Sequence, residues 1–133
     1  MTETASGDGW AVGSIDALGE GPGFRKVRGA LGVTAFGVNA VVMPPGYASG
    51  PHYHDRQEEL YLVHRGEVEF TFGEGDAEAY HVLGPGGLAR VDAATVRRFR
   101  NTSDSDEAVY LCVGGEGGYV GRDGRTVGDE APR

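Results

Sequence analysis

The sequence has little from which covalent cross-links or a membrane anchor could be built. Only one of its 133 residues, Cys112, is a cysteine, which excludes an internal disulfide. Its place in the alternating run 109–113 predicts an inert thiol on one face of a strand. No apolar run approaches the length of a membrane span. The first nine residues lack a basic segment and an apolar core, so we expect no signal peptide and a cytoplasmic protein.

Basic residues are also few. Twelve Lys and Arg stand against twenty Asp and Glu, which gives a formal net charge of −8. Nucleic acids and anionic membranes bind basic surfaces, so neither is an expected partner. No nucleotide cofactor is expected, because the glycine-rich run 114–118 is not set between a strand and a helix.

A helical period is missing too, since no segment of ten residues shows one. Short apolar runs separated by some of the 24 glycines predict an all-β fold instead, a barrel or double-sheet jelly roll. The clearest strands are predicted at Val33 to Met43, Leu60 to Arg65, Glu67 to Phe72, Ala79 to Leu83, Leu88 to Val91, Val96 to Asn101 and Ala108 to Val113.

The length predicts a single domain. We expect a disordered N-terminus over residues 1–9, an N-terminal arm over 10–32, the barrel over 33–115 and a glycine-rich acidic tail over 116–133. Within the tail, one short edge pairing is expected around Tyr119 and Val120.

The most informative stretch lies between residues 46 and 66. It holds Gly46, His52, His54, Glu59 and Gly66, and this spacing resembles the first motif of the cupin family at every position. The resemblance covers about residues 33–115. It implies a cupin-like double-stranded β-helix, usually a homodimer, with a divalent metal held inside the barrel mouth by His52, His54 and Glu59.

The second cupin motif is only partly present in the run 86–101. Gly86 and Asn101 match, whereas Asp92 and Ala94 replace the usual proline and glycine. Arg97 stands where the family places its remaining histidine ligand. The resemblance therefore implies a conserved scaffold with an incomplete metal site.

The chemistry of these residues leaves two alternatives open. Two imidazoles and a carboxylate suit Fe, Zn, Ni or Mn with open coordination positions. Alternation points Arg97 inward, where its charge would repel a dication. Arg97 then either turns to the mouth and pairs with an acid, or takes the metal's place and pairs with Glu59. In the second arrangement, the spare donors of its guanidinium are available to an anionic ligand.

Other side chains are expected to complete the pocket. Tyr61 and Phe99 are predicted to line it with Arg97, while Gln57 and Glu58 are expected in the second shell around the metal ligands. His64 and His81 are expected on the surface.

Three functions compete at this point. The first is a divalent-metal-dependent enzyme, of dioxygenase or isomerase type, acting on a small organic substrate. The second is a metal-free or weakly metal-binding protein that binds a small anionic ligand through Arg97 without catalysis. The third is a dimerising scaffold, which the intact first motif disfavours.

Overall fold

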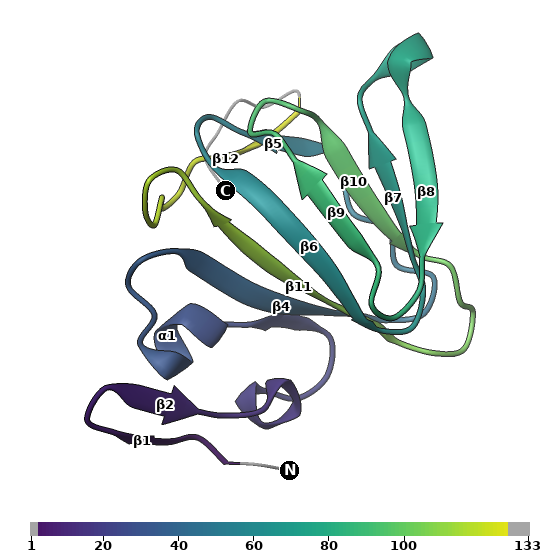
Figure 1. The fold of residues 1–133 in the computed structure, drawn as a ribbon. Coiled ribbons are helices and arrows are strands. Elements are labelled where there is room, and N and C mark those ends of the chain that lie inside the picture. Colours follow the sequence, from purple (N-terminus) through teal and green to yellow (C-terminus); the bar gives the residue numbers. More distant parts are fainter. Residues whose placement is uncertain (1–2, 128–133) are drawn as a thin grey trace.

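Two five-stranded antiparallel sheets face each other in the computed structural model, which describes residues 3–127 (Figure 1). One sheet has the order β12-β5-β10-β7-β8 and the other the order β3-β4-β11-β6-β9. The all-β jelly-roll prediction is confirmed. None of the helices within residues 3–127 is long and apolar enough to cross a membrane.

The first sheet carries the histidine motif. Its strands are β12 (Gly124–Thr126), β5 (His52–His54), β10 (Arg97–Asn101), β7 (Val68–Phe72) and β8 (Ala79–Leu83). Strand β10 lies between β5 and β7, and its register sets Arg97 directly opposite His52. The replaced ligand position and the first motif are therefore neighbours on one sheet.

The second sheet forms the opposite wall. Its strands are β3 (Gly23–Arg25), β4 (Gly37–Met43), β11 (Ala108–Gly115), β6 (Glu58–Arg65) and β9 (Leu88–Val91). Strand β11 is the centre of this sheet, pairing with β4 on one side and β6 on the other. The long runs predicted at 33–43, 60–65 and 108–113 thus become three adjacent strands.

The core lies between the two sheets, and Tyr61 and Phe99 connect it to the motif residues. It consists of Met43, Tyr61, Val63, Val68, Phe70, Val91, Phe99, Ala108 and Tyr110. The period-two alternation is clearest on β6 and β10, where buried Tyr61, Val63 and Phe99 are separated by more exposed residues, whereas consecutive residues of β11 are buried from Ala108 to Tyr110. The aromatic rings of Tyr61, Phe70, Phe99 and Tyr110 contact one another with centroids 5.0–5.7 Å apart.

Two motif residues outside the ligand set have structural roles. Gly66 joins β6 to β7 at a φ of 76°, and a Cβ there would lie 2.8 Å from the carbonyl oxygen of Glu107. Only glycine fits this turn without strain. Asn101 is buried, and its amide donates to the carbonyl oxygens of Met43 and Asp106 at 3.2 and 2.8 Å.

The N-terminal region is more ordered than the sequence suggested. The expected disorder over residues 1–9 is wrong for Ala5–Gly7, which forms β1 and pairs with β2 (Trp10–Val12). A two-residue loop joins them, in which Gly9 adopts a φ of 83°. The missed signal was the Asp8-Gly9 dipeptide, a common hairpin loop. Residues 1–2 lie outside the described part of the chain.

The arm over residues 10–32 continues with a 3₁₀ turn, η1 (Ile15–Leu18), then β3 and the short helix α1 (Val27–Leu31). Strand β3 pairs with β4, so the arm extends the second sheet, and α1 lies beside β4 (Figure 1). A second 3₁₀ turn, η2 (Gly75–Ala77), joins β7 to β8.

The tail pairs at a different place from the one expected. Tyr119 and Val120 are in no strand, and β12 (Gly124–Thr126) pairs with β5 instead. The run 114–118 is taken up by the end of β11 and the following turn, so the chain reaches the motif strand a few residues later. Residues 128–133 of the predicted tail lie outside the described range.

Candidate ligand and metal site

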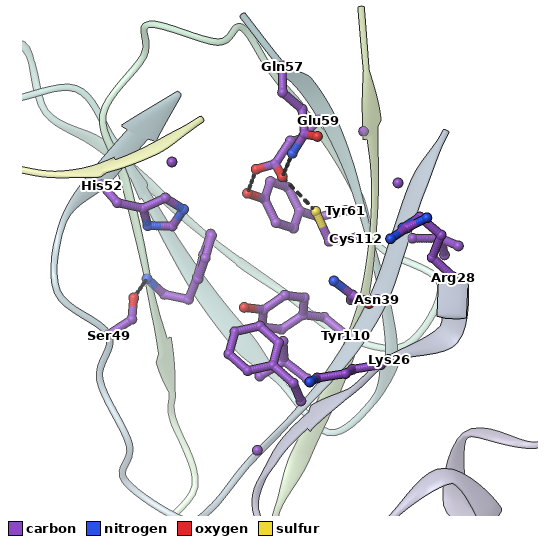
Figure 2. Close-up of a pocket in the computed structure, with 18 of the residues that line it drawn as sticks. Lys26, Arg28, Asn39, Ser49, His52, Gln57, Glu59, Tyr61, Tyr110 and Cys112 are labelled. Atoms are coloured by element: carbon purple, nitrogen blue, oxygen red, sulfur yellow. Dashed lines mark hydrogen bonds between the residues drawn. The ribbon is translucent and has the colours of Figure 1, made fainter. Parts of the chain in front are cut away.

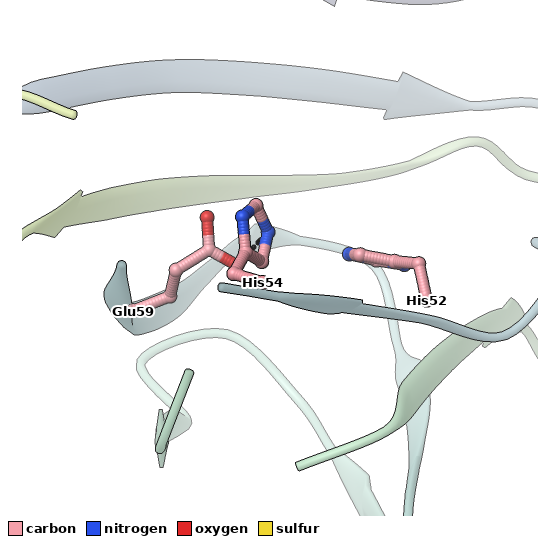
Figure 3. Close-up of side chains that lie close together, drawn as sticks. All are labelled: His52, His54 and Glu59. Carbon is pink, nitrogen blue, oxygen red and sulfur yellow. Dashed lines mark ion pairs between the residues drawn. The ribbon is translucent and has the colours of Figure 1, made fainter. Parts of the chain in front are cut away.

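The two motif histidines point into the mouth of the barrel from β5. They are two residues apart on one strand, so they share a face, and the turn at residues 55–57 brings Glu59 of β6 beside them. One potential ligand atom from each of His52, His54 and Glu59 lies within 4.8 Å of the others (Figure 3). The first motif therefore assembles a candidate metal site.

The Oε1 atom of Glu59 is surrounded by donors. It lies 3.2 Å from Nε2 of His54 and 3.3 Å from Nη2 of Arg97, and it accepts a hydrogen bond from the Tyr61 hydroxyl. Burial by itself raises the pKa of Glu59, but the hydrogen bond and charge of His54, the Tyr61 hydroxyl and the Arg97 charge outweigh it and lower the pKa to about 2. Glu59 is therefore ionised throughout the physiological range.

The Oε2 atom of Glu59 is occupied as well. It accepts a hydrogen bond from Nε2 of Gln57 at 2.6 Å and one from the thiol of Cys112 at 3.1 Å (Figure 2). Burial, followed by the charge of Glu59, raises the pKa of Cys112 well above its usual value of 9.0. The thiol is thus a neutral hydrogen-bond donor. Gln57 supports the candidate ligand Glu59 through a hydrogen bond, as was expected of it.

The predicted sites omitted Asp123, which the tail contributes. Its Oδ1 lies 2.8 Å from Nδ1 of His54, and its Oδ2 accepts the backbone N–H groups of Arg56 and Gln57 at 2.9 and 2.8 Å. Burial raises the pKa of Asp123, but the hydrogen bonds from His54 and from these two backbone groups lower it overall. Nothing in its sequence surroundings marks Asp123, because its role depends on the pairing of β12 with β5.

His54 therefore bridges two carboxylates. Burial lowers its pKa, but the hydrogen bond and charge of Glu59 and the hydrogen bond of Asp123 raise it above the usual value of 6.5 despite the nearby charge of Arg97. Both ring nitrogens face an ionised oxygen, so the imidazolium form, which donates from both, suits this geometry.

Arg97 pairs with Glu59, which was one of the two expected arrangements. Its side chain has no exposed surface. Its Nη1 atom donates to the carbonyl oxygens of Ala93 and Thr95 at 3.0 and 2.8 Å, and its Nη2 atom faces Glu59. Arg97 does not line the cavity described below, contrary to its prediction as a pocket residue, because its guanidinium is buried.

The prediction for Glu58 is also wrong. Glu58 lies one residue before Glu59 on β6, so its side chain points to the outer face, where it is exposed and pairs with Arg90 at 2.9 Å. His64 and His81 are exposed, as expected for surface histidines.

A cavity of about 930 Å³ opens beside the Glu59 cluster. The predicted pocket residues Tyr61 and Phe99 line it, and Val41, Met43 and Tyr110 form more of its apolar wall. Figure 2 shows Tyr61 and Tyr110 in the cavity. His52, His54, Gln57 and Glu59 supply the polar end. Ligand cavities of several hundred Å³ with mainly apolar walls and a few convergent polar groups are typical of small-molecule sites.

The three donors match a divalent metal in type, but their charge environment does not. Arg97 lies 3.3 Å from Glu59 Oε1. With a metal–oxygen bond of about 2.1 Å, an ion on that atom would lie within about 5.5 Å of the guanidinium. The repulsion is then about 6 kcal/mol at an effective dielectric of about 20. Binding through Oε2 would instead displace the donors Gln57 and Cys112. The residues present therefore do not fit a tightly held dication.

Comparison with solved structures agrees with this architecture. An oxalate oxidase superposes with a TM-score of 0.61 at 18% identity, covering 74% of this chain and 52% of that one. An uncharacterised conserved protein with a double-stranded β-helix domain from Klebsiella pneumoniae subsp. pneumoniae MGH 78578 gives 0.55 at 22% identity, covering 62% and 69%. A cupin superfamily protein from Desulfitobacterium hafniense DCB-2 gives 0.51 at 16% identity, covering 59% and 65%.

These likenesses establish the fold alone. The chain spans about half the length of the first structures it matches, between 42% and 56% of each. No curated protein sequence matches it significantly.

A family model described as a cupin domain matches residues 39–114, which is more than half of the chain. The matched range begins in β4 and ends in β11, so it contains both strands that carry the candidate ligands and the strand that carries Arg97. The chain therefore belongs to the cupin domain family.

Proposed function

We propose that this cupin binds a small organic molecule in the cavity at the barrel mouth and does so without a tightly held metal. The observation that carries the proposal is the cavity of about 930 Å³, which runs from apolar side chains to the polar cluster around Glu59. A structural barrel would fill this space with its own side chains, as the other end of the molecule does.

The Arg97–Glu59 pair supports the metal-free part of the proposal. A buried carboxylate needs a compensating positive charge. In a metal-bound cupin site the ion would supply that charge, whereas here Arg97 and His54 supply it. The polar end of the cavity is therefore already neutralised, and its hydrogen-bonding groups are held in fixed positions.

The second candidate is a metal-dependent enzyme that uses His52, His54 and Glu59. The cluster of ligand atoms within 4.8 Å favours it, as does Asp123, which holds Nδ1 of His54 in the manner of carboxylates that orient metal-bound histidines. Some of the structural neighbours are oxalate oxidases, two of them in complex with glycolate. A two-carbon acid would fill only a small part of a cavity of about 930 Å³.

Binding of a neutral apolar probe tests the first proposal. N-phenyl-1-naphthylamine should bind with enhanced fluorescence, equally well before and after treatment of the protein with EDTA. The variant Val41→Trp, which fills the cavity wall, should abolish binding. The control Val82→Trp lies at an exposed position of β8 outside the cavity and should bind like the parent protein.

Elemental analysis separates the two candidates. Protein purified without added metal and then dialysed should retain far less than one equivalent of Fe, Zn, Ni or Mn. A stoichiometric metal that survives dialysis, together with EDTA-sensitive probe binding, would favour the metal-dependent enzyme. Unchanged probe binding in Val41→Trp would rule out the cavity as the site.

A further inference from the structure

The basic residues of this acidic protein are divided unequally between its surface and its cavity. Among the described residues, seven arginines form ion pairs with carboxylates: Arg56, Arg65, Arg90, Arg97, Arg98, Arg100 and Arg125. Arg25 donates to the carbonyl oxygen of Gly21 at 2.6 Å. Within residues 3–127 this leaves Lys26, Arg28 and Arg122, whose side chains make neither kind of contact.

These three cations, the cavity-mouth cations, all line the cavity. The distribution is unexpected for a chain with twenty acidic and twelve basic residues, in which a cation can readily find a carboxylate. The acids on the cavity wall are already matched, since Glu59 faces Arg97 and Asp123 faces His54. The mouth therefore carries an excess of positive charge.

The guanidinium of Arg28 stacks on the Tyr119 ring and lies among the side chains that line the cavity. Its guanidinium carbon lies 3.9 Å from the centre of the Tyr119 ring, so one face of the group is stacked. Stacking leaves the N–H groups at the edge of the guanidinium available, and this edge matches the two oxygens of a carboxylate or phosphate. Helix α1 carries Arg28 and begins directly after Lys26, and Figure 2 shows both side chains across the cavity from His52.

Arg122 approaches the cavity from the tail. It is the one non-glycine residue within 3–127 that has a positive φ, at 56°. A left-handed backbone costs an ordinary residue about 1 kcal/mol or more. The neighbouring Asp123 anchors this turn on His54, so the same turn sets Arg122 at the cavity wall.

We infer that the molecule bound in the cavity is an organic acid, whose anionic group is held by Lys26, Arg28 and Arg122 while its apolar body lies among Val41, Tyr110 and Phe99. The inference rests on the proposed function and narrows its ligand class. The recognised chemistry is an anionic head, a carboxylate or a phosphate monoester, on an apolar body larger than a two-carbon acid. The anion site is thus at the mouth and not at the buried Arg97.

Two fluorescent probes with the same ring system test this inference. 8-Anilinonaphthalene-1-sulfonate carries an anionic group that N-phenyl-1-naphthylamine lacks. The anionic probe should bind about tenfold more tightly or better, and its affinity should fall with added salt, because exposed cations are screened. The neutral probe should show little salt dependence.

The variant Lys26→Gln/Arg28→Gln/Arg122→Gln should remove this preference. It should weaken binding of the anionic probe by about tenfold or more and change the affinity for the neutral probe by less than about twofold. Arg100→Gln is the matched control for charge, because Arg100 is exposed on β10, pairs with Glu69 and does not line the cavity. It should leave both affinities unchanged.

Competition against the anionic probe identifies the head group. Displacement by octanoate, but not by octan-1-ol, would support a carboxylate, and stronger displacement by octyl phosphate would support a phosphate monoester. Equal displacement by the alcohol and both acids would overturn the inference.

The two proposals fail in different ways. Suppose the two probes bind with equal affinity and Val41→Trp abolishes binding of both. The cavity would then still be a ligand site, but the inferred preference for acids would be wrong. Retained preference in the triple variant would also overturn it. If neither probe binds, both the proposed function and this inference are wrong.

Discussion

Replacing Arg97 with histidine is the sharpest test of why this cupin should bind metal weakly. The substitution removes the buried positive charge 3.3 Å from Glu59 and places an imidazole where the family places its remaining histidine ligand. The repulsion worked out above, about 6 kcal/mol, corresponds to roughly four decades of affinity. Glu59 screens part of this repulsion, so we expect zinc affinity to rise by at least about 100-fold.

The stability of Arg97→His should fall at the same time. The guanidinium is fully buried and donates to the carbonyl oxygens of Ala93 and Thr95, which histidine cannot satisfy together. Breaking a buried ion pair costs about 3–5 kcal/mol, so urea denaturation should show a loss of this order in the absence of metal. Added zinc should restore part of that loss, because it binds the folded state preferentially.

The assay is competition for zinc between the dialysed protein and a chromophoric chelator. Arg97→Gln removes the charge without adding a ligand and should give an intermediate affinity. Arg100→His adds a histidine on the exposed face of the same strand and should match the parent protein. If folded Arg97→His and Arg97→Gln both bind zinc within about threefold of the parent, the electrostatic reasoning is wrong.

Three further predictions concern stability, and a fourth concerns assembly. His54 has a raised pKa, so its contribution to the free energy of unfolding is complete below about pH 6.5 and is lost as the pH rises through its folded pKa. Glu59 has a pKa lowered to about 2, so its contribution is complete above about pH 4.5 and is lost as the pH falls toward 2. Urea denaturation as a function of pH should therefore show greatest stability between these limits, and a flat profile would contradict it. Asp123→Asn should lower the free energy of unfolding by about 1–3 kcal/mol, because one amide oxygen cannot accept hydrogen bonds both from His54 and from the backbone N–H groups of Arg56 and Gln57. The same substitution should lower the pKa of His54, which NMR would measure. Gly66→Ala should lower the free energy of unfolding more than Gly86→Ala does, because both positions have a positive φ but only at Gly66 would a Cβ meet backbone atoms. Equal losses of stability in urea denaturation would show that only φ matters. We also propose that the protein is a homodimer, which light scattering at the monomer mass would contradict.

The sequence was sufficient for the fold class because alternation is a local property. Val68 and Phe70 alternate with polar neighbours along β7, and both are fully buried. Gly66 marks the turn between β6 and β7 because its φ of 76° is a backbone conformation that favours glycine. These signals require no knowledge of distant strands.

The sequence also identified the polar end of the cavity. His52, His54 and Glu59 are close in the chain, and strand period alone puts the histidines on one face. The same period pointed Arg97 inward and Arg98 and Arg100 outward, which the structure shows. A spacing of a few residues within one or two strands was enough for these expectations.

What only the tertiary structure decided depends on pairing between distant segments. Asp123 meets His54 because β12 joins β5 across 69 positions of sequence, and local pattern does not encode that pairing. The same limit applies to Lys26 and Arg28, which reach the cavity because the N-terminal arm packs beside β4. The sequence pointed Arg97 into the pocket, but only the assembled barrel shows that its guanidinium is buried against Glu59 and does not line the cavity.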